Sequence, residues 1–321
     1  MQKEKSIKNS ISMLFNEVIS FVKQDFNWVA YLYTFIFICA IIFANYHFEF
    51  YNKIINPTFY KGVSIPTFFV FYVAVYFSVA IPTLLLRHEF HLLKQSKFYL
   101  KSLFFIALYA ISIGFFEYRN WDFATFTTSE KYYIIKLLSN LKGSVLVMLP
   151  LFIFKTFFDK KIDGLYGLCN NSKHLKVYLL ALLVMLPFLV ATSLTPDFLS
   201  AYPQFKVWHF DCVFNLPAWL YTPFYEMFYA LDFVNTELFF RGAMVIGMAA
   251  ILDKRAILPM AAFYVAIHFG KPMGETISSM FGGYILGILA YQTRHIWGGV
   301  VAHIGIALIM EIMGFFNYYV K

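Results

Sequence analysis

Hydrophobic residues follow one another along most of this chain, in runs long enough to cross a bilayer. A helix that spans the hydrocarbon core needs about 20 mainly apolar residues. Runs of this kind occupy residues 28–47, 66–86, 100–116, 144–158, 177–195, 214–252, 256–270, 276–292 and 296–316. The pattern predicts an all-α, polytopic membrane helical bundle with about eight or nine transmembrane helices. Two points stay open: whether the short fourth run spans, and whether the sixth run is one tilted helix or two pieces.

The chain begins with a different pattern, in which apolar residues recur at helical spacing between polar ones. The recurring positions are Ile7, Ile11, Leu14, Val18 and Val22. Residues 1–26 are therefore predicted to form an amphipathic segment that lies at the membrane interface, and not a cleaved signal peptide. The sequence then divides into N-terminal transmembrane helices, 27–210, and a C-terminal helical core, 211–321, in which polar residues gather.

Composition and charge agree with a membrane protein. Of 321 residues, 60% are hydrophobic and 14% are charged, whereas a soluble domain carries about 25% charged residues. The net charge of +8 comes from cations in short loops, without the long basic run of a nucleic-acid partner. Cations concentrate around residues 87–101 and 159–176. By the positive-inside rule these loops and the N-terminus are predicted to be cytoplasmic, in a protein of the cell (inner) membrane.

Ionisable residues appear in the last third, where the bilayer should disfavour them. Glu237 and Arg241 stand four residues apart, and His268 and His303 lie within separate apolar runs. A charge in the membrane is costly and is by default a functional hypothesis. A carboxylate with two imidazoles suits the activation of water. The alternatives are an i,i+4 ion pair and histidines that bond helix to helix.

Three stretches resemble the motifs of a known family. They read "TELFFRG", "FYVAIHFG" and "GGYILGILAYQTRHIWGGVVAH", and are similar to the E-E-x-x-x-R, F-x-x-x-H and H-x-x-x-N motifs of the CPBP family (CAAX proteases and bacteriocin-processing proteins, the Abi-type membrane proteases). The resemblance covers about residues 220–316. It implies an intramembrane endopeptidase with Glu237, His268 and His303 as catalytic residues and Arg241 in support. It also implies a peptide or protein substrate at the lipid bilayer.

The sequence departs from the family pattern at three positions. Thr236 stands where the family has its first glutamate, Ala307 replaces the asparagine, and Tyr264 replaces a phenylalanine. A threonine hydroxyl is no base near neutral pH, so Glu237 is expected to take that role. A methyl group at position 307 cannot donate to an oxyanion, a loss of about 3 kcal/mol of transition-state stabilisation in other systems.

Three further acids are candidates for lining the same cavity. Asp232 lies one turn before Thr236, Glu226 lies about three turns before Glu237 on the same helix face, and Glu311 lies one turn beyond Ala307. Each offers a carboxylate that compensates for the groups missing from the family pattern.

The sequence leaves other functions open. The departures also fit a catalytically impaired relative that acts as a membrane scaffold or immunity-type protein. A transporter that uses the buried charges as a proton relay fits the polar core, but not the order of the motifs. A metal is a further alternative: Glu237, His268 and His303 are the ligands expected for a zinc site with an open position.

Overall fold

The computed structural model describes residues 2–169, 175–210 and 212–320, which form helices and no strand. The α-helices are α1 (Gln2–Asp25), α2 (Trp28–His47), α3 (Pro57–Tyr60), α4 (Ser64–Leu86), α5 (Phe90–Leu93), α6 (Ser96–Gly114), α7 (Thr128–Gly143), α8 (Leu149–Phe158), α9 (Leu175–Thr192), α10 (Pro196–Ala201), α11 (Ala218–Glu237), α12 (Ala249–Leu252), α13 (Ile257–Ala266), α14 (Met273–Thr293) and α15 (Trp297–Val320). Short π or 3-10 segments join or extend them: η1 (Tyr51–Ile55), η2 (Glu117–Asn120), η3 (Ser144–Met148), η4 (Val207–His209), η5 (Leu238–Gly247) and η6 (Asp253–Ala256).

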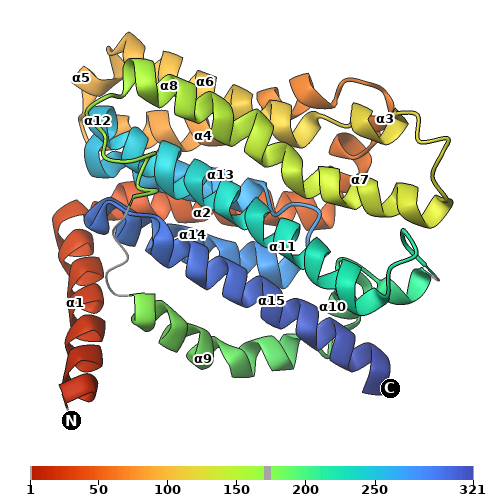
Figure 1. The fold of residues 1–321 in the computed structure, drawn as a ribbon. Helices are drawn as coiled ribbons and strands as arrows, with labels where there is room; N and C mark the ends of the chain where they lie inside the picture. The colour runs from red at the N-terminus through yellow and green to blue at the C-terminus, as the bar shows by residue number, and fades with distance from the viewer. Residues whose placement is uncertain (1, 170–174, 211, 321) are drawn as a thin grey trace.

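The long helices run side by side, and α1 crosses their ends (Figure 1). Among the described residues, five helical stretches are long and apolar enough to cross a membrane, and a sixth counts if the two parts of α9, bent by 44°, form one span. The all-α, polytopic membrane fold is thereby confirmed. The five are Trp28–His47, Ser64–Leu86, Ser96–Asn120, Thr128–Phe158 and Trp297–Val320. The predicted count of about eight or nine also includes the C-terminal runs that form α11, α13 and α14, and it stays a prediction.

Several predicted boundaries shift in the structure. The run at 144–158 is the second half of a longer helical stretch that begins at Thr128, and the run at 214–252 is one nearly continuous helix interrupted by the π segment η5. Helix α13 ends at Ala266, before the predicted end at residue 270. There the chain turns through Gly270, whose φ of +90° is a conformation that glycine adopts without steric strain.

The centre of the bundle is made from two short segments of the C-terminal part. All ten residues of η5 and all ten of α13 are buried. They pack in one hydrophobic cluster with residues of α2, α4 and α6. The helices of 27–210 thus help to bury η5 and α13, whereas α11, α14 and α15 also carry exposed side chains. The functional division between 27–210 and 211–321 stays a prediction.

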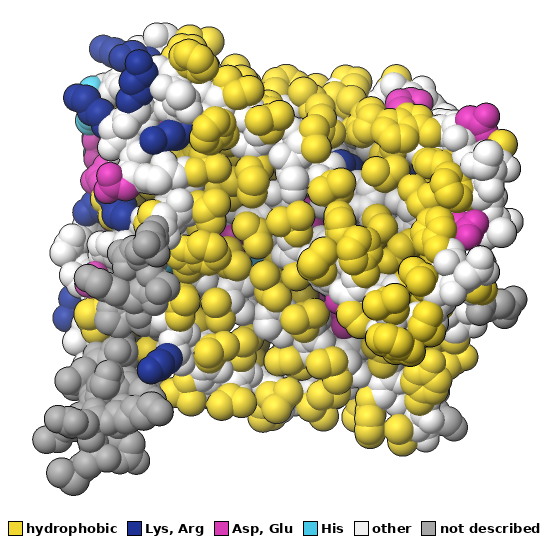
Figure 2. All heavy atoms as spheres, viewed as in Figure 1, with side chains coloured by type: hydrophobic (Ala, Val, Ile, Leu, Met, Phe, Trp, Pro, Cys, Tyr) yellow, Lys and Arg dark blue, Asp and Glu magenta, His cyan; other side chains and the backbone are white. Residues whose placement is uncertain are grey.

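The face drawn in Figure 2 has an apolar band between two polar ends. Hydrophobic side chains cover most of this face, Lys and Arg gather mainly at the end where α1 lies, and acidic groups are visible at both ends. This distribution supports the predicted interfacial position of α1. On that helix Leu14 and Phe21 are buried against the bundle, whereas Phe15 and Phe26 are exposed.

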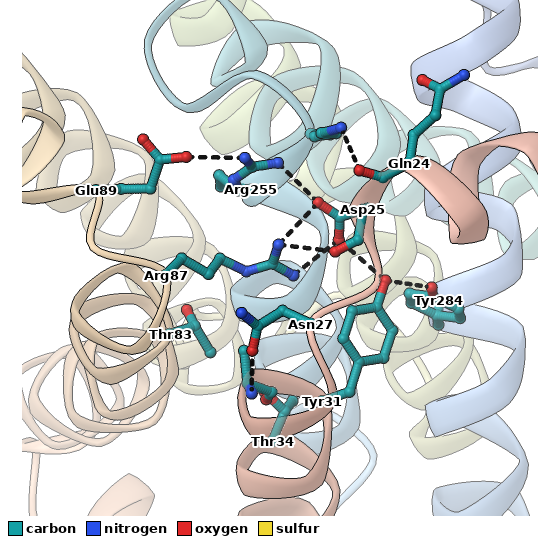
Figure 3. Close-up of polar contacts among 12 residues, drawn as sticks. Gln24, Asp25, Asn27, Tyr31, Thr34, Thr83, Arg87, Glu89, Arg255 and Tyr284 are labelled. Atoms are coloured by element: carbon teal, nitrogen blue, oxygen red, sulfur yellow. Dashed lines mark hydrogen bonds and ion pairs between the residues drawn. The ribbon is translucent and has the colours of Figure 1, made fainter.

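A buried charge cluster fastens α1 to the bundle (Figure 3). The carboxylate of Asp25, at the end of α1, accepts hydrogen bonds from Arg87 at 2.9 Å and from Arg255 at 2.8 Å. Arg255 also donates to Glu89 at 2.8 Å, and Tyr31 donates to Asp25 at 2.9 Å. Because this carboxylate is only 2% exposed, its paired arginines are what make its burial tolerable.

Candidate active site

Four elements position the residues singled out by the motifs. Glu237 is the last residue of α11, and Arg241 lies in η5 just after it. His268 lies in the turn that follows α13, and His303 lies in the second turn of α15. The π segment matters because its wider turns change the direction in which successive side chains point, and such segments are frequent at functional sites.

Glu237, Arg241 and His303 lie in contact at the centre of the protein. Oε1 of Glu237 is 2.9 Å from Nη1 of Arg241 and accepts a hydrogen bond of 3.1 Å from Nδ1 of His303. Glu237 and Arg241 are 0% and 1% exposed, and His303 is 17% exposed. The carboxylate therefore both neutralises the arginine and orients the imidazole. With Nδ1–H donating to Glu237, the lone pair of His303 lies on Nε2.

His268 is held in place by a hydrogen bond to the helix that precedes it, α13. Its Nδ1 lies 2.8 Å from the carbonyl oxygen of Tyr264, and because a carbonyl can only accept, Nδ1 is the protonated nitrogen. The ring of Tyr264 lies edge-on to His268 at 4.7 Å and to His303 at 6.3 Å. Both imidazoles thus have Nδ1 occupied and present Nε2 as an acceptor.

The buried guanidinium of Arg241 contacts an aromatic ring as well as the carboxylate of Glu237. Its guanidinium carbon lies 4.1 Å from the centre of the Tyr264 ring, a cation–π contact that strengthens when water is excluded. The contact with Glu237 is a close ion pair rather than an aligned hydrogen bond, and Nε and Nη2 have no hydrogen-bond partner among the described residues. Tyr264 therefore touches Arg241 and both histidines.

Two glycines of α15 make the close approach possible. A methyl group at Gly299 would overlap Oε2 of Glu237, and one at Gly298 would overlap the ring of Tyr178. Oε2 of Glu237 is buried and has no hydrogen-bond partner in the part of the chain that the structure describes. In the sequence, the adjacent pair "GG" at 298–299, within the third motif stretch, is the one signal that could have indicated this close approach.

The three additional acids have other surroundings. Both carboxylate oxygens of Glu226 are buried without a partner among the described residues. Glu311 accepts hydrogen bonds of 2.9 and 3.0 Å from the backbone N–H of Gln204. Asp232 lies near the positive charge of Lys142. For the described residues, no hydrogen bond or ion pair joins these acids to the catalytic candidates, so their cavity-lining role stays a prediction.

The arrangement does not fit a zinc site. Zinc in proteins takes three or four ligands from histidine, cysteine and carboxylate side chains. Within the described ranges, no three such groups converge as they would around a metal ion. Oε1 of Glu237 is engaged by Arg241 and His303, and the ring of His268 lies 4.7 Å from that of Tyr264.

Comparison with known proteins finds a family model that is similar to the part of the chain that contains this site. Residues 208–309 match the model of a family described as type II CAAX prenyl endopeptidase Rce1-like. This range contains all three motif regions and the four residues Glu237, Arg241, His268 and His303. The resemblance to the CPBP and CAAX protease family is thereby confirmed. Searches of curated proteins and of solved structures gave no match.

Proposed function

We propose that the protein is an intramembrane endopeptidase that hydrolyses a peptide bond with a water molecule activated by Glu237 and the two histidines. The observation that carries this proposal is the buried contact of Glu237 with His303 and Arg241. It lies within the region that matches an endopeptidase family. The substrate is a peptide or protein at the membrane, and the surrounding lipid bilayer is the other partner.

Glu237 is the proposed general base. Oε1 is fixed by Arg241 and His303, which leaves Oε2 free to accept a proton from water. As the water oxygen bonds to the carbonyl carbon, the carbonyl π electrons move onto its oxygen. When that intermediate collapses, the C–N bond breaks and the nitrogen takes the proton from Glu237. Water has two O–H donors, so one points to Oε2 of Glu237 and the other donates to the Nε2 lone pair of His268 or His303, which aligns the water.

The experiment is hydrolysis of a panel of membrane peptides, prenylated and unprenylated, by the purified protein. We expect the wild-type protein to cleave at least one peptide and Glu237→Gln to cleave none, because the amide keeps the shape but accepts no proton. His268→Ala and His303→Ala should each lower the rate by about 100-fold or more. Thr236→Ala should have little effect. Equal cleavage by Glu237→Gln, or loss of activity in Thr236→Ala alone, would overturn the assignment of the base.

A chelator tests the alternative metal mechanism in the same assay. Because the side chains do not converge as zinc ligands, we expect the cleavage rate to be unchanged after dialysis against EDTA. A loss of activity that zinc restores would contradict this expectation.

The second candidate is a catalytically impaired relative that serves as a scaffold. Thr236 and Ala307, which replace a glutamate and an asparagine of the family pattern, favour it. The double variant Thr236→Glu, Ala307→Asn discriminates between the two. An inert wild type with an active double variant would identify a scaffold, whereas an active wild type supports the endopeptidase.

A further inference from the structure

Peptide hydrolysis places negative charge on the carbonyl oxygen, and the site needs a donor for it. At position 307, where the family pattern has an asparagine, this chain has a methyl group buried beside Tyr225 and Tyr229. We propose that the hydroxyl of Tyr178, on α9, donates the missing hydrogen bond to the developing oxyanion. This inference rests on the proposed endopeptidase function. Tyr178 lies outside the family-matched residues 208–309, and no motif marks it.

The position of the hydroxyl follows from the contact with Gly298. The atom of Tyr178 that a methyl group at Gly298 would meet first is Cζ, the ring carbon that bears the hydroxyl, followed by the two Cε atoms. The polar end of the ring therefore lies against the backbone of α15, and the rest of the side chain extends back toward α9.

The carboxylate of Glu237 lies against the next residue of the same turn. A methyl group at Gly299 would meet Oε2 of Glu237 first, and neighbouring Cα atoms are about 3.8 Å apart. The phenol of Tyr178 and the free oxygen of Glu237 thus contact consecutive residues of α15, whose side-chain directions differ by about 100°. The carbonyl oxygen of a peptide attacked by water beside Oε2 is the group to which we assign this hydroxyl as a donor.

The surroundings hold the phenol in place. Tyr178 is 5% exposed and packs with Leu14 of α1 and Leu289 of α14. One turn further along α9, Leu182 fits against Gly305 in the same way, so two glycines of α15 receive two side chains of α9. A donor fixed before the reaction stabilises the transition state without reorganisation during it.

The chemistry needs only the water that the hydrolysis already consumes. A phenol with an ordinary pKa of about 10 keeps its proton at neutral pH. It donates a hydrogen bond as the oxyanion forms and retains the proton when the C–N bond breaks. The reaction involves no oxidation or reduction.

The test is the variant Tyr178→Phe, assayed with the peptide that the wild-type protein cleaves fastest. The ring still fills the space at Gly298, so we expect the Tm to stay near the wild-type value. The loss of one oxyanion donor should lower kcat by about 100-fold with little change in KM. The control is Tyr133→Phe, which removes a buried hydroxyl that donates to the carbonyl oxygen of Tyr221 at 2.8 Å, and its kcat should be unchanged.

A second pair of variants tests the position rather than the hydroxyl. Gly298→Ala would push the ring of Tyr178 off α15 and should lower kcat, whereas Gly282→Ala, where a methyl group meets nothing within 4 Å, should not.

An active wild type with full kcat in Tyr178→Phe would refute the inference and leave the endopeptidase function standing. A raised KM with unchanged kcat would also refute it, because it would assign the side chain to substrate packing. Wild-type protein that cleaves no peptide would instead refute the proposed function.

Discussion

Gly299→Ala is the substitution that tests most directly whether the catalytic carboxylate depends on its fit against α15. The added methyl group would overlap Oε2 of Glu237, and the next atom of that side chain, Cδ, would be 2.9 Å away. Real Cβ contacts are essentially never this short, so either α15 or the carboxylate has to move. The same carboxylate is bonded to His303 at 3.1 Å and lies 2.9 Å from Arg241, so its displacement disturbs both contacts.

The two opposing contributions to stability differ in size. Replacing a helical glycine with alanine stabilises a helix by up to about 1 kcal/mol. Disrupting a buried ion pair costs about 3–5 kcal/mol. We therefore expect Gly299→Ala to lower the free energy of unfolding by about 2–4 kcal/mol, the difference of these two values. A shift of about 1 Å in a catalytic group also lowers the rate by about 100-fold.

The assay is thermal unfolding of the purified protein in detergent, with peptide hydrolysis measured on the same samples. Gly282→Ala is the matched control, because its helix α14 has open space at that position, and it should unfold at or slightly above the wild-type temperature. If Gly299→Ala were as stable as Gly282→Ala and retained wild-type activity, this result would refute the close contact between Oε2 of Glu237 and Gly299 of α15.

Two further predictions concern the other charged groups and the orientation. Asp25→Asn should lower the free energy of unfolding by about 3–5 kcal/mol, because it removes the buried carboxylate that pairs with Arg87 and Arg255 and leaves Arg255 with Glu89 alone; a Tm equal to that of the wild type would show that the cluster does not hold α1. Single cysteines at Lys97 and Lys160, in a cysteine-free background, should react with an impermeant maleimide only after cells are permeabilised. Labelling of either position in intact cells would reverse the predicted orientation.

The helices were predictable from the sequence where the apolar pattern is continuous. The run at 28–47 coincides with α2, and the run at 66–86 lies within α4, because long apolar stretches in a bilayer leave the backbone no alternative to a helix. Two features were not predictable: the π segment η5, and the end of α13 at Ala266. All residues of η5 and α13 are buried, so the geometry of these two segments is decided by packing against helices that are distant in the sequence.

The site was predictable only in part, for a related reason. Glu237 and Arg241 could be paired from their spacing, and His303 was expected near them from the resemblance of the motifs. Local spacing could not reveal that Tyr264 binds Arg241 with its ring. Nor could it reveal that Tyr178 meets Gly298, because no motif in the sequence links α9 to the start of α15. Contacts between separate helices depend on the three-dimensional packing.

The buried pair of Glu237 and Arg241 makes physical sense only as part of this larger arrangement. An i,i+4 pair contributes about 0.2–0.5 kcal/mol on an exposed helix, far less than it costs to remove two charges from water. Here the cation also lies on the ring of Tyr264 and the anion also accepts a hydrogen bond from His303. Even so, Oε2 of Glu237 is left without a partner among the described residues. A protein selected for stability alone would satisfy or remove that oxygen, whereas a general base has to keep it free for the proton of water.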